Sequence, residues 1–192
     1  CHGGEFTEEM HPYVICRLIG DEAAEAVAMR MARALGVGIV SLSKYRGEPP
    51  PDPSGARPAW WLWPKKGLCD KLGIPEITPE IGQVGDRDDS LMYGGIVNVL
   101  KELGFLKGPA IQHPEPNVIG DRWWLTANQE GIYFPVVTVG QEVTKGTFLG
   151  EVRDYFGTVL QTVEAPDDAT VMNMNIGMPV KKDGFLIWLG QF

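Results

Sequence analysis

The sequence predicts an α/β half followed by a small all-β half. Strand-like segments and amphipathic helical segments alternate over about the first hundred residues. A proline-rich joint, GPAIQHPEPN, follows at 108–117. From Arg122 to Phe192, short β-prone runs are separated by turn residues and no helical period is visible. We therefore expect one domain over 1–108 and a second, β-rich domain over 109–192, which a chain of 192 residues can accommodate.

The first predicted elements are a strand, a helix and a second strand. Residues 12–19 (PYVICRLI) are mostly apolar and β-prone, which predicts a strand. Asp21 then caps a helix whose apolar side chains recur at helical spacing, and Gly36 marks its end. Residues 36–42 (GVGIVSL) predict a short buried strand, which leads into a proline-rich surface loop at 45–58.

One more strand and one more helix complete the α/β half. Residues 74–82 (IPEITPEIG) predict a strand, in which Pro79 indicates an edge, an end or a bulge. Residues 88–104 predict a second amphipathic helix that ends at Gly104.

The β-rich half contains two similar phrases, VGQEVTKGTFLGEV (139–152) and MPVKKDGFLIWL (178–189). They resemble the paired half-motifs of the lipoyl and biotinyl barrel-sandwich fold. The hairpin that carries the modified lysine in that fold corresponds to VMNMN (171–175), which has no lysine, so we do not expect a swinging-arm carrier. The predicted strands lie in RWWLTAN (122–128), GIYFPVV (131–137), TFLGEV (147–152), GTVLQTV (157–163), ATVMNMNI (169–176) and FLIWLGQF (185–192).

Composition excludes several classes of function. The formal net charge of −8 disfavours a nucleic-acid partner, because an acidic chain repels the phosphate backbone. No apolar run approaches the length needed to cross a bilayer, so we expect no membrane association. Cys1, Cys16 and Cys69 are odd in number and scattered, which favours free thiols in a reducing compartment and hence a cytoplasmic location.

Few side chains in the sequence are suited to metal binding or acid–base chemistry. His2 and Glu5 have the H-x-x-E spacing of a zinc hydrolase, although this pair alone is common by chance. His11 and His113 each precede a proline and are typical of structural or solvated histidines. Glu80 ends a predicted strand and, taken alone, is typical of a surface carboxylate, as Trp60, Trp61 and Trp63 are of loop or core anchors.

Three segments together resemble the succinylglutamate desuccinylase/aspartoacylase family of zinc-dependent deacylases. They are CHGGEFTEEMHPYVI (1–15), GIPEITPEIG (73–82) and NVLKELGFL (98–106). The resemblance implies that His2 is the third zinc ligand and that Glu80, within TPEIG, is the general base. It also implies that 1–108 is the C-terminal part of a zinc-carboxypeptidase-like α/β/α domain, and that the β-rich half is the family's closing domain. Placing His2 and Glu5 on the family's first H-x-x-E is the weaker alignment, since only His11 would then be available as a further histidine ligand before Glu80.

The resemblance also implies a site that this chain does not complete. The family's other two metal ligands, and the arginines that hold the substrate carboxylate, precede the matching region. Because a catalytic zinc site uses three protein ligands, we expect an upstream polypeptide to supply the rest, either as a second chain cut from one precursor or as a missing fragment. A higher oligomer is also compatible with the sequence. The expected substrate is a small N-acyl amino acid or similar amide, with Arg57, Trp60 and Trp61 contacting it.

Two other functions fit part of the sequence. The chain begins with Cys1, and an N-terminal cysteine freed by self-cleavage can be an amidohydrolase nucleophile that uses its own α-amine as base. That reading explains neither Glu80 nor the β-rich half. A non-catalytic assembly module is the third possibility.

Overall fold

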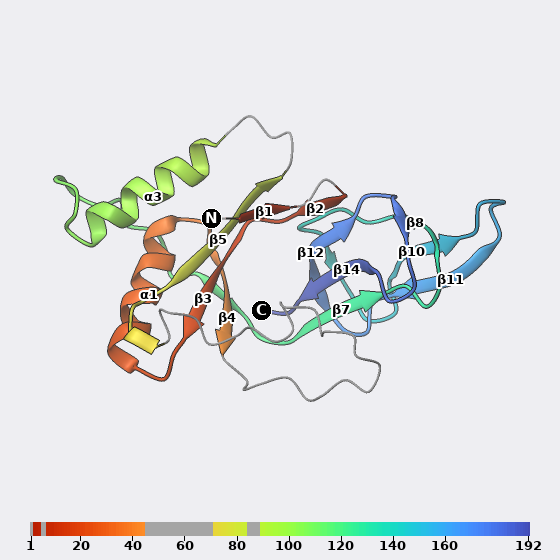
Figure 1. Ribbon diagram of the computed structural model, residues 1–192, viewed down its shortest axis with the longest axis horizontal. Helices are drawn as coiled ribbons and strands as arrows, with labels where there is room; N and C mark the ends of the chain where they lie inside the picture. The colour runs from red at the N-terminus through yellow and green to blue at the C-terminus, as the bar shows by residue number, and fades with distance from the viewer. Residues whose placement is uncertain (1, 5–6, 45–70, 84–88) are drawn as a thin grey trace.

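The computed structural model describes residues 2–4, 7–44, 71–83 and 89–192. A mixed sheet carrying helices forms one half of the molecule, and two packed sheets form the other (Figure 1). We call these the α/β half and the β-rich half. The mixed α/β class expected from the sequence is confirmed.

The sheet of the α/β half contains strands in both directions. Strand β5 runs parallel to β1 and antiparallel to β3, whereas β3, β4 and β6 are parallel to one another. In spatial order the strands are β1 (His2–Gly4), β5 (Ile77–Gln83), β3 (Tyr13–Leu18), β4 (Ile39–Lys44) and β6 (Asn117–Ile119).

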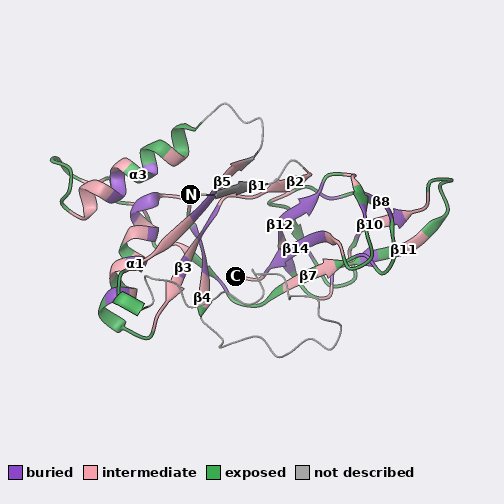
Figure 2. Cartoon of the chain, in the orientation of Figure 1, coloured by how far each residue is buried: buried purple, intermediate pink, exposed green. Residues whose placement is uncertain are grey.

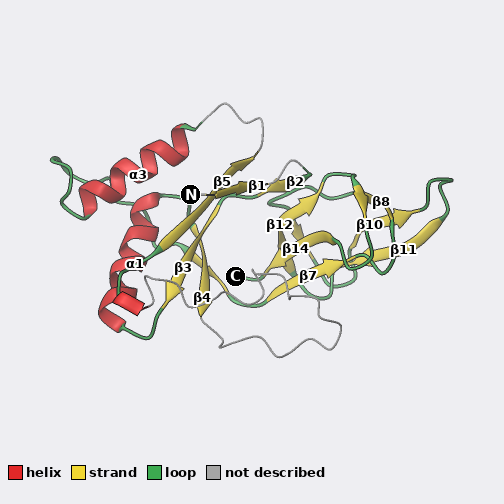
Figure 3. Ribbon diagram, viewed as in Figure 1, coloured by secondary structure: helices red, strands yellow, loops and turns green. Residues whose placement is uncertain are grey.

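Helices α1 (Glu22–Leu35) and α3 (Ser90–Glu102) cover one face of this sheet (Figure 3). The predicted caps of the first helix are confirmed. The Asp21 carboxylate accepts hydrogen bonds from two backbone N–H groups of the first turn, at 3.0 and 3.1 Å. Gly36 ends α1 with a φ of 82°, a left-handed conformation that favours glycine.

The two faces of β3 pack against different partners. Val14 and Cys16 lie in a core shared with the helices. On the opposite face, a buried cluster joins the α/β half to the β-rich half, and we call this cluster the junction. Among the described residues the helices lie on one face only, so the expected α/β/α layering stays a prediction. The junction consists of Tyr13, Ile39, Ile119, Met172 and Trp188.

The β-rich half consists of two sheets that enclose their own core, in which buried residues line β12 and β14 (Figure 2). One sheet has the order β2-β12-β14-β7, with β9 also pairing with β12, and the other has the order β11-β10-β8-β13. The strands are β2 (Glu8–Met10), β7 (Arg122–Thr126), β8 (Gly131–Pro135), β9 (Glu142–Val143), β10 (Phe148–Arg153), β11 (Val159–Glu164), β12 (Ala169–Asn175), β13 (Pro179–Val180) and β14 (Phe185–Gly190).

Two strands cross the expected division at residue 108. Strand β2, near the start of the chain, pairs with β12 of the β-rich half. Strand β6, beyond the proline-rich joint, pairs with β4 of the α/β half. Each half is therefore completed by a strand from the other side of the division in sequence.

Two details differ from the sequence predictions. The hairpin expected at 171–175 is wrong, because these five residues form the buried body of β12. Pro79 does not mark an edge strand, because β5 lies between β1 and β3. The register of β1 against β5 does shift after Glu80, which is the bulge alternative. None of the helices in the described part of the chain has the length and apolar character needed to cross a membrane.

Candidate active site

Glu80 lies within β5, on the sheet face turned toward the β-rich half. Its paired residue on the antiparallel strand β3 is Tyr13, and its paired residue on the parallel strand β1 is His2. Pro79 pairs with Val14, whose side chain belongs to the helix-side core, so Glu80 points to the opposite face. Its exposed fraction is 8%. A carboxylate this buried is unusual, since Glu is almost never fully buried unless paired.

Three charged residues, Glu80, Glu8 and Arg122, affect the pKa of the Tyr13 hydroxyl. The Tyr13 ring packs edge-on against Trp188, with the ring centroids 4.8 Å apart and the planes at 70°. Burial raises the pKa of Tyr13 far above its ordinary value, and the negative charges of Glu80 and Glu8 raise it further, against a lowering by Arg122. The phenol is therefore neutral throughout the physiological range.

Glu8 comes to this site from the other half of the molecule. It lies on β2, which pairs with β12 and also lies close to β5. The side-chain amide of Asn173, on β12, donates from Nδ2 to Glu8 Oε2 at 2.9 Å. Asn173 is only 7% exposed, and its Oδ1 accepts no hydrogen bond from any of the residues that the structure describes. The buried Trp188 Nε1 likewise has no acceptor within the described part of the chain.

Arg122 supplies the positive charge that acts on Tyr13. From β7 of the β-rich half, its Nη1 donates to Ser41 Oγ at 3.1 Å and its Nη2 donates to the Leu42 carbonyl at 3.0 Å. Both acceptors belong to β4, so these hydrogen bonds also tie the two halves together.

The structure brings two of the sequence-predicted site residues together and does not describe the others. His2 and Glu80 occupy paired backbone positions on adjacent strands. Cys1, Arg57, Trp60 and Trp61 lie outside the described residues, as does Glu5.

A metal site is not complete within the described residues. They contain no group of three or more His, Cys, Asp or Glu side chains able to hold a metal ion. His113 instead packs against Gly36 at the end of α1, and the His11 ring lies beside Gly140.

Sequence reasoning missed Tyr13, Glu8, Asn173 and Arg122. Tyr13 falls in the predicted strand 12–19, and the alternation of side chains along that strand could have placed it on one face of the sheet. The other three reach the site through pairing between distant strands, which no local pattern reveals.

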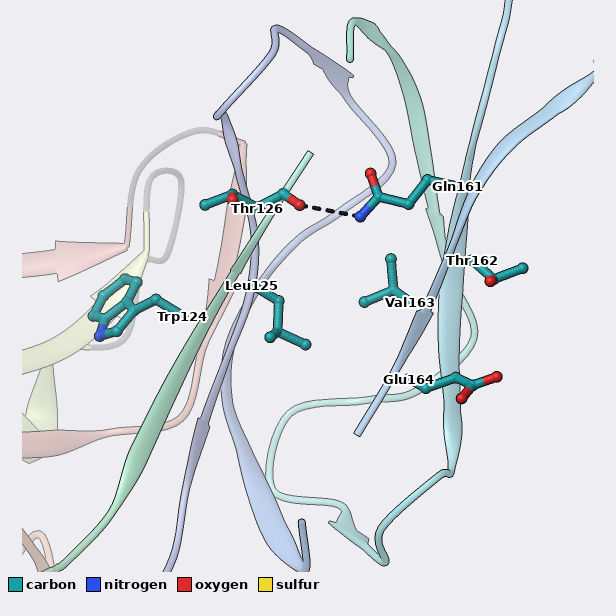
Figure 4. A pocket seen from close by; sticks show the side chains of 7 residues that line it. All are labelled: Trp124, Leu125, Thr126, Gln161, Thr162, Val163 and Glu164. Atoms are coloured by element: carbon teal, nitrogen blue, oxygen red, sulfur yellow. Dashed lines mark hydrogen bonds between the residues drawn. The ribbon is translucent and has the colours of Figure 1, made fainter. Parts of the chain in front are cut away.

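A pocket of about 310 Å³ lies between the two sheets of the β-rich half, away from Glu80. Leu125 and Val163 point toward each other across it, and Gln161 Nε2 donates to the Thr126 carbonyl at 3.1 Å (Figure 4). Trp124 points away from the pocket (Figure 4) and stacks on Trp188, with the ring centroids 5.2 Å apart. Thr162 and Glu164 also line the pocket, but their side chains point away from Leu125 (Figure 4), so we assign no chemistry to it.

The fold is that of a known group of solved structures. No protein-family model matches the sequence, and no curated protein matches it. The product-bound ectoine utilization protein EutE (DoeB) from Ruegeria pomeroyi superposes with a TM-score of 0.77 and 19% identity, over 100% of this chain and 56% of that protein. An aspartoacylase family protein from Mesorhizobium loti superposes with a TM-score of 0.73 and 19% identity, over 99% of this chain and 55% of that protein. A succinylglutamate desuccinylase/aspartoacylase from Rhodobacter sphaeroides superposes with a TM-score of 0.71 and 19% identity, over 96% of this chain and 55% of that protein.

These similarities confirm the resemblance to the succinylglutamate desuccinylase/aspartoacylase family at the level of the fold. The chain spans a little over half the length of the solved structures it matches.

Proposed function

We propose that this chain, with the fold of the succinylglutamate desuccinylase/aspartoacylase proteins, forms part of a hydrolase that cleaves the amide bond of an N-acyl amino acid or a similar small amide. The observation that carries the proposal is Glu80. It is a buried carboxylate on the inner face of the sheet, in backbone register with His2 and beside a tyrosine that stays neutral.

In this reaction Glu80 acts as the general base. It takes a proton from the attacking water while the water oxygen bonds to the carbonyl carbon. The C–N bond then breaks, and the products are a carboxylate and a protonated amine, so both water hydrogens end on the amine nitrogen. Glu80 then returns this proton to the leaving nitrogen, and the second proton passes to the amine from the new carboxylic acid as that acid becomes the carboxylate product.

The proposal includes a zinc ion held in part by His2. A zinc ion supplies polarisation of the carbonyl and acidification of a water. Because one histidine does not make a three-ligand site, we propose that an upstream polypeptide provides the remaining ligands. Arg57, Trp60 and Trp61 are proposed to contact the substrate, and the scattered cysteines favour a cytoplasmic protein. Size-exclusion chromatography with intact mass analysis tests for the second polypeptide, and a zinc-loaded, active 21.1 kDa species alone would contradict it.

Glu80→Gln tests the assignment, because the amide keeps the shape of the side chain and removes its basic oxygen. We expect kcat for an N-acyl amino acid to fall by about 10²–10⁴-fold while zinc content stays unchanged. His2→Ala should instead remove the bound zinc, as measured by elemental analysis. Glu76→Gln is the matched control. Glu76 lies just before the start of β5, beside Arg17, and the enzyme carrying this substitution should keep its activity. Near-normal turnover in the Glu80 variant would overturn the role.

A further inference from the structure

The sheet β11-β10-β8-β13 exposes apolar side chains on the face turned away from its own core, which we call the outer face. Glu151 pairs with Phe134 on β8 and with Thr162 on β11. Glu164, two residues beyond Thr162, pairs with Phe148, so all of these side chains share the outer face. The large apolar side chains exposed on or beside it are Phe134, Val136, Phe148 and Val159. A solvent-facing antiparallel sheet usually carries polar side chains, and an apolar patch of this kind marks an interaction surface.

The hairpin that joins β10 to β11 ends in two exposed aromatic side chains. Phe156 is 96% exposed and Tyr155 is 72% exposed. The Asp154 carboxylate accepts hydrogen bonds from the backbone N–H groups of Phe156 and Thr158, both at 2.8 Å, and these bonds fix the turn. The hairpin projects from the end of the β-rich half (Figure 1). Side chains that are fixed before a partner arrives lose less entropy on association, so this tip is suited to docking.

The order of side chains along this hairpin is self-complementary. The sequence of side chains is aromatic, acidic, basic and again aromatic, at Phe148, Glu151, Arg153 and Phe156. Within one copy, Arg153 forms an ion pair with Glu151. A two-fold axis that lies across the strands, between Glu151 and Arg153, brings the Arg153 of one copy opposite the Glu151 of the other. The same rotation brings the tip residue Phe156 over the Phe148 of the second copy.

We propose that the outer face and the hairpin tip bind the same surface of a second copy of this chain, forming a two-fold symmetric dimer. Such a contact requires a self-complementary surface, which the order of side chains along β10 supplies. Four aromatic side chains, each able to bury about 150–250 Å², bring the face close to the roughly 800 Å² that each partner contributes to a standard interface. Glu164 lies on the edge strand β11 and therefore at the margin of the contact.

This inference is independent of the proposed hydrolysis. The sheet β2-β12-β14-β7 lies between the outer face and the α/β half, because Met172 and Trp188 of that sheet pack in the junction. The dimer therefore leaves the surroundings of Glu80 uncovered, and loss of the dimer should leave the chemistry of Glu80 unchanged.

Native mass spectrometry and sedimentation velocity of the intact protein count the copies of this chain in each particle. We expect two copies, which contribute twice the 21.1 kDa of one chain. A particle with a single copy, whether alone or with a different polypeptide bound to the outer face, would overturn the proposal.

Charge reversal tests the register of the contact. Arg153→Glu and Glu151→Arg should each give single copies, because like charges then meet across the axis. Mixing these two variants should restore a dimer, since the two glutamates of one copy face the two arginines of the other. An ion pair that only stabilises its own hairpin would not be rescued by mixing. Near-ultraviolet circular dichroism confirms that each variant is folded, and folded variants that do not associate when mixed would contradict the proposed axis.

The hairpin tip provides a second test that does not alter the charges. Phe156→Ser changes only an exposed turn residue and should raise the Kd of the dimer by about 10–100-fold. Phe105→Ser is the matched control, because Phe105 is also highly exposed but lies in the α/β half, and it should leave the Kd unchanged. If a charge variant does not fold, this comparison decides, and equal Kd values for the two phenylalanine variants would overturn the dimer.

Discussion

Tyr13 is the single residue whose surroundings depend most on both halves of the molecule. Its ring contacts Trp188 of the β-rich half, and charged residues on β2, β5 and β7 shift the pKa of its hydroxyl. Its ionisation therefore measures whether the two halves are correctly joined.

Replacing Tyr13 should change how stability depends on pH. The folded-state pKa of Tyr13 is raised above the ordinary value of about 10, so at higher pH the folded protein binds a proton that the unfolded chain has released. Stability then falls as pH rises above about 10. In Tyr13→Phe the slope should be shallower, by an amount that rises toward about 1.4 kcal/mol per pH unit as pH passes 10, as measured by urea unfolding between pH 9 and 11. Identical slopes in the two proteins would contradict the burial and charge effects on Tyr13.

At this scale the sequence indicated Glu80 and His2 but not the residues around them. The TPEIG and HGG segments are local patterns, and each can be recognised within a few residues. Glu8 and Asn173 are 165 residues apart, and nothing in their own segments of the sequence indicates that they meet. Their contact follows from strand pairing, which depends on the whole fold rather than on neighbouring residues.

Among the elements, α3 shows how two adjacent glycines can have opposite importance. Gly95 faces α1, and a Cβ there would lie 2.7 Å from the Leu35 carbonyl oxygen and 2.9 Å from Leu35 Cδ1. Gly94 has nothing within 4 Å of the same position. The close approach of the two helices thus depends on Gly95 alone of this pair.

We expect Gly95→Ala and Gly94→Ala to shift the free energy of unfolding in opposite directions. Alanine at position 95 must push the α1 backbone away, which should destabilise the protein by about 1–3 kcal/mol. Alanine at position 94 should stabilise it by about 0.5–1 kcal/mol, because glycine is a poor helix former. Urea unfolding of the two variants measures both shifts. A gain in stability at position 95 would show that the helices do not pack as closely as described.

Most elements could be predicted because their signals are local. Asp21 and Gly36 bound the first helix, and each of the six apolar runs after Arg122 contains a strand. The hairpin at 171–175 failed because it was inferred from a resemblance, whereas the segment itself contains no glycine or proline. The place of β5 between β1 and β3 was not predictable, since Pro79 is tolerated there beside an irregular register.

For the whole molecule, the exchange of β2 and β6 makes the two halves interdependent. Without residues 1–108, β12 loses the partner β2, and Met172 and Trp188 lose their cover from Tyr13. Unpaired strand edges and exposed apolar clusters favour aggregation.

Separating the chain at the expected domain division should therefore impair folding. We expect the fragment 109–192 to unfold at lower urea concentration than the intact chain, or to aggregate, as followed by near-ultraviolet circular dichroism. Co-expression with 1–108 should restore the signal, because the contacts between the pieces are non-covalent. A fragment 109–192 as stable as the intact chain would show that the division coincides with independent domains after all.

The pairing of β2 with β12 also affects how the protein emerges from the ribosome. A ribosome adds roughly 5–20 residues per second, so β2 is synthesised on the order of 10–30 s before its partner exists. During that interval the strand bearing Glu8 has no sheet to join, although β3 and β5 are already able to pair. The β-rich side of the candidate site is thus assembled only as the last part of this sequence is translated, and a nascent chain arrested earlier would carry Glu80 without Glu8 in place.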